Sequence, residues 1–297
     1  MADVFFKTYE AIGNREDLID IITDISPLET PMFSSFSKTK ASGTYHEWQT
    51  DSLADAASNS VIEGTDVTSA SATPTVRTGN YTQILRKDWR ISDTQEAVDS
   101  AGRPSEYSYQ MAKGMKELAR DIEYALVNGT GAAGDATAGR ELKGVLAWIT
   151  TNVNTGASAV TAEDLSETVY NDMLQTIFES GGNPDVTYAN GWQKRKISQF
   201  STSSTRNISV EDKRLVNAID VYESDFGVQK IVLDRYMTST IVACLQNDLF
   251  RVASLRPTIH KSLPDDGGGR KGMVETELTL ESLNEAGSGK ITELTTS

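Results

Sequence analysis

The stretch PSEYSYQMAKGMKELARDIEYALVNG, residues 104–129, carries the strongest structural signal in this sequence. Its apolar side chains recur every three or four residues, the period of one face of an α-helix: Tyr107, Met111, Met115, Leu118, Ile122, Ala125 and Leu126. Pro104 is typical of a first helical turn. Asn128-Gly129 is typical of a helix that ends at a residue in the left-handed backbone conformation. At the helical rise the segment is about 37 Å long, roughly twice the usual length. This pattern predicts an elongated scaffold.

Strands are predicted on both sides of this helix. Upstream, TYHEWQT after Gly43 and VRTGNYTQILRKDWRIS from Val76 have the aromatic content and alternation of strands. Downstream, the residues of one parity are Val274, Thr276, Leu278 and Leu280, and those of the other are Glu275, Glu277, Thr279 and Glu281. A further strand is expected from Lys290 to Leu294. We expect the terminal strands to pair beside the long helix, which gives an α+β fold with a discontinuous domain.

The region from about 160 to 255 alternates helix and strand, which predicts a small α/β subdomain. Thr161 with Asp164 resembles a capping box before a helix that ends at Gly181. VTYANG then suggests a strand, GWQKRKISQF a short helix, and the residues around a Ser224 to Gly227 turn suggest two strands.

Two segments are poor core formers. SPLETPMFSSF, with Pro27 and Pro31, is expected to form an extended arm because proline restricts the residue before it and removes backbone donors. Residues 51–75 carry four acidic residues, no basic residue and few large aliphatic side chains. Burial within this segment cannot offset its ordering entropy, so it is either disordered or held by a partner. The flanking strands favour a projecting hairpin over an interdomain linker.

Composition excludes several classes of protein. Lys and Arg number 28 against 42 Asp and Glu, and the net charge of -14 argues against sequence-independent binding to nucleic acid or an anionic membrane. One cysteine, Cys244, rules out an intrachain disulfide, and two distant histidines offer no zinc motif. Without a signal peptide or a long apolar run, we expect a non-exported protein of a reducing compartment.

The motif search finds no catalytic, cofactor or metal site. Gly129, Gly131 and Gly134 match GxGxxG, but the required strand does not precede them. Asp225-Phe226-Gly227 lacks the other kinase motifs, and DDGGGRKG at 265–272 lacks the phosphate-loop spacing and is expected to be a loop. Lys194, Arg195 and Lys196 form a basic cluster, either a solvated helix face or a contact with an acidic neighbouring subunit. An arm, an acidic loop and an overlong helix fit a protein whose partners are copies of itself.

At this point the sequence resembles a known family. The similar segments are TYEAIGNREDLIDIITDISPLETP, EWQTDSL with the downstream Glu63-Gly64, RDIEYALVNGTG, and LRPTIHKSLPDDGGGRKGMVETELTLESLNEAGSGKI. In colinear order over essentially the whole chain, they resemble one family of major capsid proteins of tailed double-stranded DNA bacteriophages with the Hong Kong 97-type fold. The resemblance implies an N-terminal arm at 1–40, an E-loop hairpin at 41–92, a P-domain at 93–159 with a spine helix at 104–128, an A-domain at 160–255, and return strands of the P-domain at 256–297.

The resemblance also implies a structural, non-enzymatic function. Copies would form hexamers and pentamers of an icosahedral head that encloses DNA without sequence-specific or membrane contacts. The head would be assembled in the bacterial host cytoplasm with a portal and a separate scaffolding protein; a decoration protein is left open. The alternatives are a cargo-holding compartment of the same fold and an α+β enzyme with an unrecognised site.

Contact residues between subunits are expected on the arm and on the hairpin. They are Pro27, Glu29 and Pro31 on the arm, and Trp48, Glu63, Asp66 and Arg77 on the hairpin. A local hairpin core for Trp48 and plain solvation for the charged side chains are the alternatives. Some capsids of this fold are joined by an isopeptide bond from an E-loop lysine, but residues 51–75 contain no lysine. We therefore predict no such cross-link from this loop.

Overall fold

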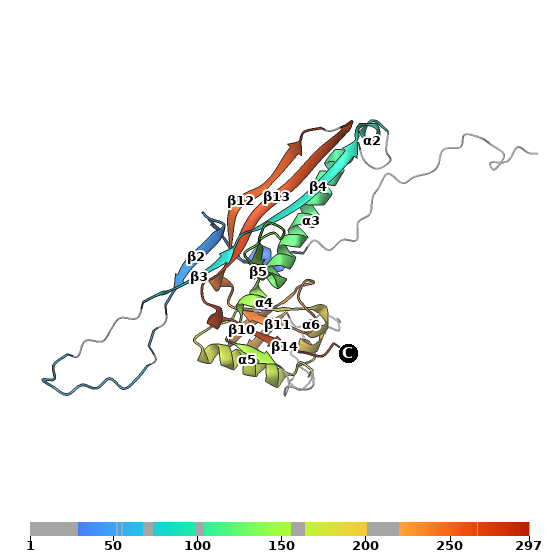
Figure 1. Ribbon diagram of the computed structural model, residues 1–297. Coiled ribbons are helices and arrows are strands. Elements are labelled where there is room, and N and C mark those ends of the chain that lie inside the picture. Colours follow the sequence, from blue (N-terminus) through green and yellow to red (C-terminus); the bar gives the residue numbers. More distant parts are fainter. Residues whose placement is uncertain are drawn as a thin grey trace, which may run out of the picture.

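The computed structural model describes residues 29–51, 53–54, 56–67, 74–98, 104–155, 164–200, 220–265 and 267–296. These residues form an elongated body with a sheet at each end (Figure 1). The first sheet has the strand order β1 (Ser37–Lys40), β12 (Phe250–Leu263), β13 (Gly269–Ser282) and β4 (Gln83–Ser92). The second has the order β7 (Val153–Thr155), β14 (Gly289–Thr292), β11 (Val242–Leu245), β8 (Val186–Ala189), β10 (Gly227–Leu233) and β9 (Val221–Ser224). The predicted α+β fold class is confirmed.

The long helix α3 (Glu106–Asn128) lies along the four-stranded sheet (Figure 1). It begins two residues later than Pro104 because the Ser105 hydroxyl accepts a hydrogen bond from the Ser108 N–H at 3.2 Å and caps the helix. The packing is close: a Cβ atom on Gly272 of β13 would lie 2.5 Å from the Tyr107 hydroxyl. A larger residue at position 272 would therefore have to displace the side chain of Tyr107 or Trp89.

The strand predicted from Val76 is two strands, β3 (Val76–Tyr81) and β4, with different partners. β3 pairs with β2 (Tyr45–Thr50), whereas β4 pairs with β13. The break lies at Thr82, whose N–H donates to the Thr44 carbonyl at 2.8 Å and whose hydroxyl donates to Glu277 at 2.8 Å. The loop predicted at 265–272 is also shorter than expected, since β13 already begins at Gly269.

The predicted subdomain is present, but its sheet includes strands from outside 160–255. β14 pairs with β11 and β7 in the six-stranded sheet, so the expectation that this last strand lies beside the long helix is wrong. The physical reason is burial: Ile291 is fully buried in the core of the six-stranded sheet. By contrast, β13 returns to β4 and contacts α3 as expected.

The helices of this part of the chain follow the predicted order, with one corrected boundary. α5 (Glu167–Glu179) is capped by the Ser166 hydroxyl, which accepts from the Val169 N–H at 3.3 Å. The capping box proposed at Thr161 and Asp164 is therefore not the helix start; Thr161 lies outside the described residues, and the Asp164 carboxylate bonds to Lys196 at 2.8 Å. The remaining helices are α1 (Pro31–Ser35), α2 (Asp93–Ala97), α4 (Val145–Trp148) and α6 (Gly191–Ile197).

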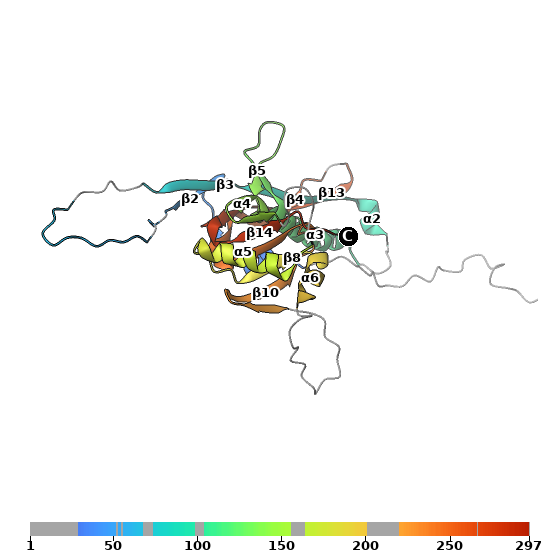
Figure 2. The same ribbon diagram turned by 90° about the horizontal axis from the view of Figure 1, so that it is seen from below.

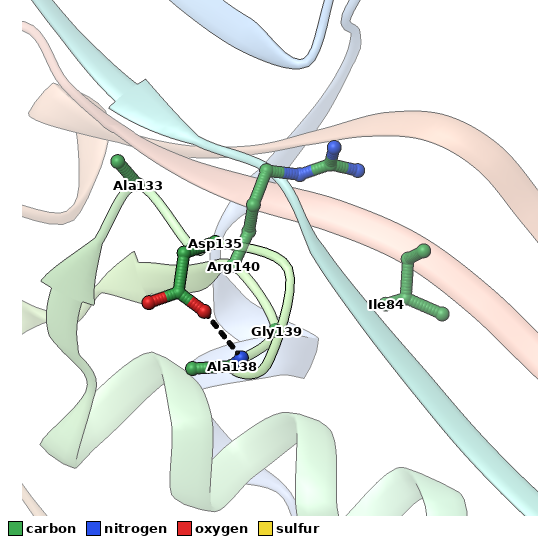
Figure 3. Close-up of a pocket in the computed structure, with 7 residues that line it drawn as sticks. Ile84, Ala133, Asp135, Ala138, Gly139 and Arg140 are labelled. Atoms are coloured by element: carbon green, nitrogen blue, oxygen red, sulfur yellow. Dashed lines mark hydrogen bonds between the residues drawn. The ribbon is translucent and has the colours of Figure 1, made fainter.

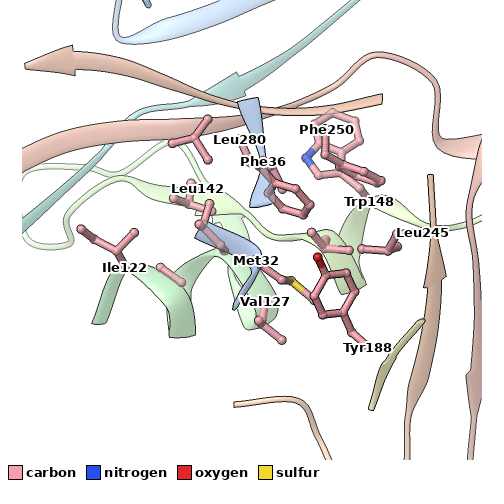
Figure 4. Packing of buried hydrophobic residues seen from close by; sticks show 14 of the residues in the cluster. Met32, Phe36, Ile122, Val127, Leu142, Trp148, Tyr188, Leu245, Phe250 and Leu280 are labelled. Atoms are coloured by element: carbon pink, nitrogen blue, oxygen red, sulfur yellow. The ribbon is translucent and has the colours of Figure 1, made fainter. Parts of the chain in front are cut away.

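The main core lies between α3, the four-stranded sheet, and strands β8 and β11 of the six-stranded sheet (Figure 4). Met32 lies in α1 and Phe36 directly follows it. Both side chains insert into this core beside Tyr188 of β8. A second core under α5 surrounds Tyr170, Met173 and the single cysteine, Cys244. Burial raises the pKa of the Cys244 thiol to about 11, which is the environment of an inert structural cysteine.

Candidate assembly surfaces

The hairpin β2–β3 carries a segment that extends far from the body of the subunit (Figures 1 and 2). Large aliphatic side chains in this segment are almost fully exposed, at 97% for Leu53, 83% for Ile62 and 95% for Val67. Glu63 and Asp66, two of the predicted contact residues, are exposed beside them. Exposed aliphatic side chains on a projecting segment indicate a surface that is covered by a partner.

The base of this hairpin is anchored to its own subunit. Trp48 packs against Trp148 of α4, with ring centroids 5.5 Å apart. His46 Nε2 lies 2.6 Å from Glu281 Oε1 of β13, and Arg77 pairs with Glu47 across the hairpin. Trp48 and Arg77 therefore make contacts within the chain, and a role for them between subunits stays a prediction.

A row of buried glutamates on β13 supports the same base. Glu277 accepts hydrogen bonds from Arg256 Nε at 2.8 Å, Arg140 Nη2 at 2.7 Å and Thr82 Oγ1 at 2.8 Å. Desolvation acts to raise the pKa of Glu277, but these hydrogen bonds and the two arginine charges hold it below its usual value. Glu275 bonds to Arg256 Nη1 at 2.8 Å. The sequence analysis did not predict this network. Its only sign in the sequence is that the glutamates occupy alternate positions of one strand and therefore lie on the same face.

The face of the four-stranded sheet opposite α3 carries basic, acidic and apolar side chains along Arg86–Arg90 of β4 and the residues paired with them. On β4 the outward side chains alternate with those that face the helix, and Arg86 and Asp88 are 57% and 68% exposed. Residues directly opposite on neighbouring strands share a face. The strand register places three further groups on this face. Lys271 lies opposite Arg90, Met273 and Lys261 lie in register with Asp88, and Glu275 and Ile259 lie in register with Arg86. Basic side chains outnumber acidic ones on this face.

The described part of the arm is fixed to the long helix by a buried carboxylate. Glu123 of α3 accepts the backbone N–H groups of Met32 at 2.7 Å and Phe33 at 2.8 Å. Burial raises its pKa to about 7. Of the predicted arm contacts, Pro31 opens α1, Glu29 lies 3.7 Å from Arg235, and Pro27 lies outside the described residues. Glu123 was missed because its partners are backbone groups 90 residues away in sequence.

The basic cluster on α6 is divided between two environments. Lys194 pairs with Asp220 at 2.7 Å and Lys196 with Asp164 at 2.8 Å, so both are bound within the chain. Arg195 instead stacks over the ring of Trp192 at 4.3 Å and is exposed.

A surface hollow lies between β4 and the loop that joins β5 (Thr130–Ala132) to β6 (Glu141–Lys143), and Ile84, Asp135 and Arg140 line it (Figure 3). Asp135 is satisfied locally: hydrogen bonds from the Thr137 hydroxyl and neighbouring N–H groups lower its pKa. No group of three or more His, Cys, Asp or Glu side chains that could hold a metal ion occurs among the described residues. The helices in the described ranges include none long and apolar enough to cross a membrane.

Comparisons with known proteins agree with this geometry. The model of the SU10 major capsid protein family matches residues 5–295. The major capsid protein of Escherichia phage Phieco32 is 27% identical, with 96% of this chain and 95% of that protein covered. The cyanophage A-1(L) capsid structure superposes with a TM-score of 0.72 at 14% identity, covering 98% of this chain and 99% of that one. A structure from Gordonia phage Cozz gives a TM-score of 0.65 at 13% identity, covering 96% and 92%. The chain therefore belongs to the SU10 major capsid protein family, has the Hong Kong 97-type capsid fold, and is a phage major capsid protein, a structural component of the virion and not an enzyme.

Proposed function

We propose that copies of this chain assemble into hexamers and pentamers that close an icosahedral head around the phage DNA. Assembly takes place in the bacterial host cytoplasm, with a portal and a separate scaffolding protein as partners. The enclosed DNA is not bound sequence-specifically, in keeping with the net charge of -14. The observation that carries this proposal is the projecting segment of the β2–β3 hairpin, which exposes aliphatic side chains that its own subunit does not cover.

Burial of these side chains supplies the driving force. A fully buried aliphatic side chain contributes about 1.5–3 kcal/mol, so Leu53, Val61, Ile62 and Val67 together offset part of the entropy lost when the segment is ordered. The segment extends away from its own body, so the surface that covers it belongs to another copy (Figure 2). Its acidic side chains are opposite in charge to the basic side chains of the open sheet face, of which Arg86 and Lys261 already pair with Asp88 and Glu275 of that face.

The subunit is best divided as the resemblance implies, with two refinements from the sheets. We assign residues 1–40 to the arm, 41–92 to the E-loop hairpin, 93–159 and 256–297 to the P-domain, and 160–255 to the A-domain. The six-stranded sheet supports extending the A-domain to include β7 and β14. Because β12 begins at Phe250, the P-domain return is better placed at that residue.

Assembly is tested by expressing the chain alone and with the neighbouring head proteins, then measuring light scattering and imaging by negative stain. We expect shells, or hexamers and pentamers, for the unmodified chain. The double variant Glu63→Lys/Asp66→Lys should lose them because it reverses the charge of the loop, whereas Glu63→Asp/Asp66→Glu, which conserves charge, should assemble normally. A monomer under every condition, or normal shells from the charge-reversed loop, contradicts the proposal.

A further inference from the structure

The six-stranded sheet exposes aromatic and acidic side chains at one end. β8 and β10 are parallel and both start at this end, where the turn before β10 meets the last turn of α5. Phe178 and Phe226 contact each other there, with ring centroids 5.7 Å apart, and Phe178 is 61% exposed. Glu179 and Asp225, which follow Phe178 and precede Phe226, are exposed as well. We call these four residues the acidic aromatic end.

The opposite end of the sheet is basic. α6 follows directly after β8, so it lies at the end where the parallel strands finish. Arg195 is exposed and stacks on Trp192 at 4.3 Å. Its neighbours Lys194 and Lys196 are neutralised by aspartates, whereas Arg195 forms no ion pair with any residue of the described ranges. We call Trp192 and Arg195 the basic end.

We propose that the acidic aromatic end of one copy docks against the basic end of the next copy around each hexamer and pentamer. This inference rests on the proposed ring assembly and names the two faces that meet in it. A closed ring requires a head-to-tail contact between two different surfaces of the same chain. The two ends meet this requirement because they lie at opposite ends of one sheet and carry opposite charge.

The chemistry of the two ends also suits an interface. Tyr, Trp, Phe and Arg are the side chains enriched at the centres of protein interfaces, and three of these types occur here. In the docked pair, Phe178 and Phe226 would cover the exposed part of Trp192. The Arg195 guanidinium would then reach Asp225 while keeping its place over the indole ring.

Site-directed cross-linking tests the contact directly. The double variant Asp225→Cys/Arg195→Cys, in the full chain assembled into shells, is treated with a short bismaleimide reagent. The single native thiol, Cys244, is fully buried and does not react. We expect a ladder of linked subunits on a denaturing gel that ends at the hexamer, and no ladder from either single variant. Shells that assemble normally but yield only monomer would overturn the docking inference while leaving the proposed ring assembly intact.

A charge exchange provides a second measurement that does not depend on the reagent. Asp225→Arg alone and Arg195→Asp alone should each lower the yield of shells at least tenfold, because like charges would then face each other. Combining the two substitutions restores the opposite charges and should recover most of the yield. Equal loss in the single and double variants, or no loss in either single variant, contradicts the contact. Absence of shells from the unmodified chain would instead contradict the proposed function.

Discussion

The buried carboxylate between the long helix and the arm makes stability depend on pH in a direction that can be calculated. Glu123 is fully buried, and its pKa rises from an ordinary 4.5 to about 7. Between these two values the folded chain holds a proton that the unfolded chain has released. Unfolding therefore releases a proton, and the free energy of unfolding falls as the pH rises through this window.

The size of the effect follows from the shift. One pKa unit corresponds to about 1.4 kcal/mol, so the shift of Glu123 lowers the free energy of unfolding by about 3 kcal/mol between pH 4 and pH 8. Glu123→Gln places a neutral side chain of the same shape at this site. The variant should lack this pH-dependent loss, but its amide nitrogen cannot accept one of the two backbone N–H groups, of Met32 and Phe33, that the carboxylate accepts. The difference in unfolding free energy should therefore shift in favour of the variant by about 3 kcal/mol between pH 4 and pH 8.

Urea unfolding of the unassembled chain at pH 4, 6 and 8, followed by tryptophan fluorescence, measures the difference. Glu29→Gln is the matched control because the Glu29 side chain is 65% exposed, and it should follow the unmodified chain at every pH. The reasoning is refuted if the difference in unfolding free energy between Glu123→Gln and the unmodified chain is the same at all three pH values.

Three further predictions concern stability and covalent state. Glu277→Ala should lower the free energy of unfolding by about 2 kcal/mol in urea titrations, because its two arginine partners lose a buried acceptor; an unchanged midpoint would contradict the network. Gly272→Ala should cost about 1–3 kcal/mol because the added Cβ meets the Tyr107 hydroxyl, whereas Gly139→Ala, with no atom nearby, should be neutral. Shells boiled in detergent should run as monomers, because loop 51–75 has no lysine, and a covalent ladder would contradict this prediction.

Local patterns were sufficient for most individual elements. The spacing of apolar residues predicted the long helix, because a helix buries one stripe of side chains whatever sheet covers it. The lack of basic and bulky residues in 51–75 predicted a segment unable to fold alone, and Leu53 and Val67 are accordingly exposed. The resemblance identified the capsid protein family correctly because several segments match in the same order along the chain, which is more specific than one short motif.

Local sequence patterns could not predict which distant strands pair with each other. Nothing in the sequence near Thr82 shows that the chain changes partners there, since the change depends on Glu277 and Thr44. The placement of β14 in the second sheet was missed for a similar reason: a short apolar strand can be buried by either sheet, and only the space beside β11 and β7 decides.

The sequence by itself therefore determined the α+β class, the long helix, the projecting acidic hairpin and the capsid family, because these depend on periodicity, composition and segment order. Only the tertiary structure decided which sheet each late strand joins, that Glu123 holds the arm, and which charges meet at Glu277. Each of these joins groups far apart in the chain, and the desolvation and hydrogen-bond geometry that govern them exist only once the chain has folded.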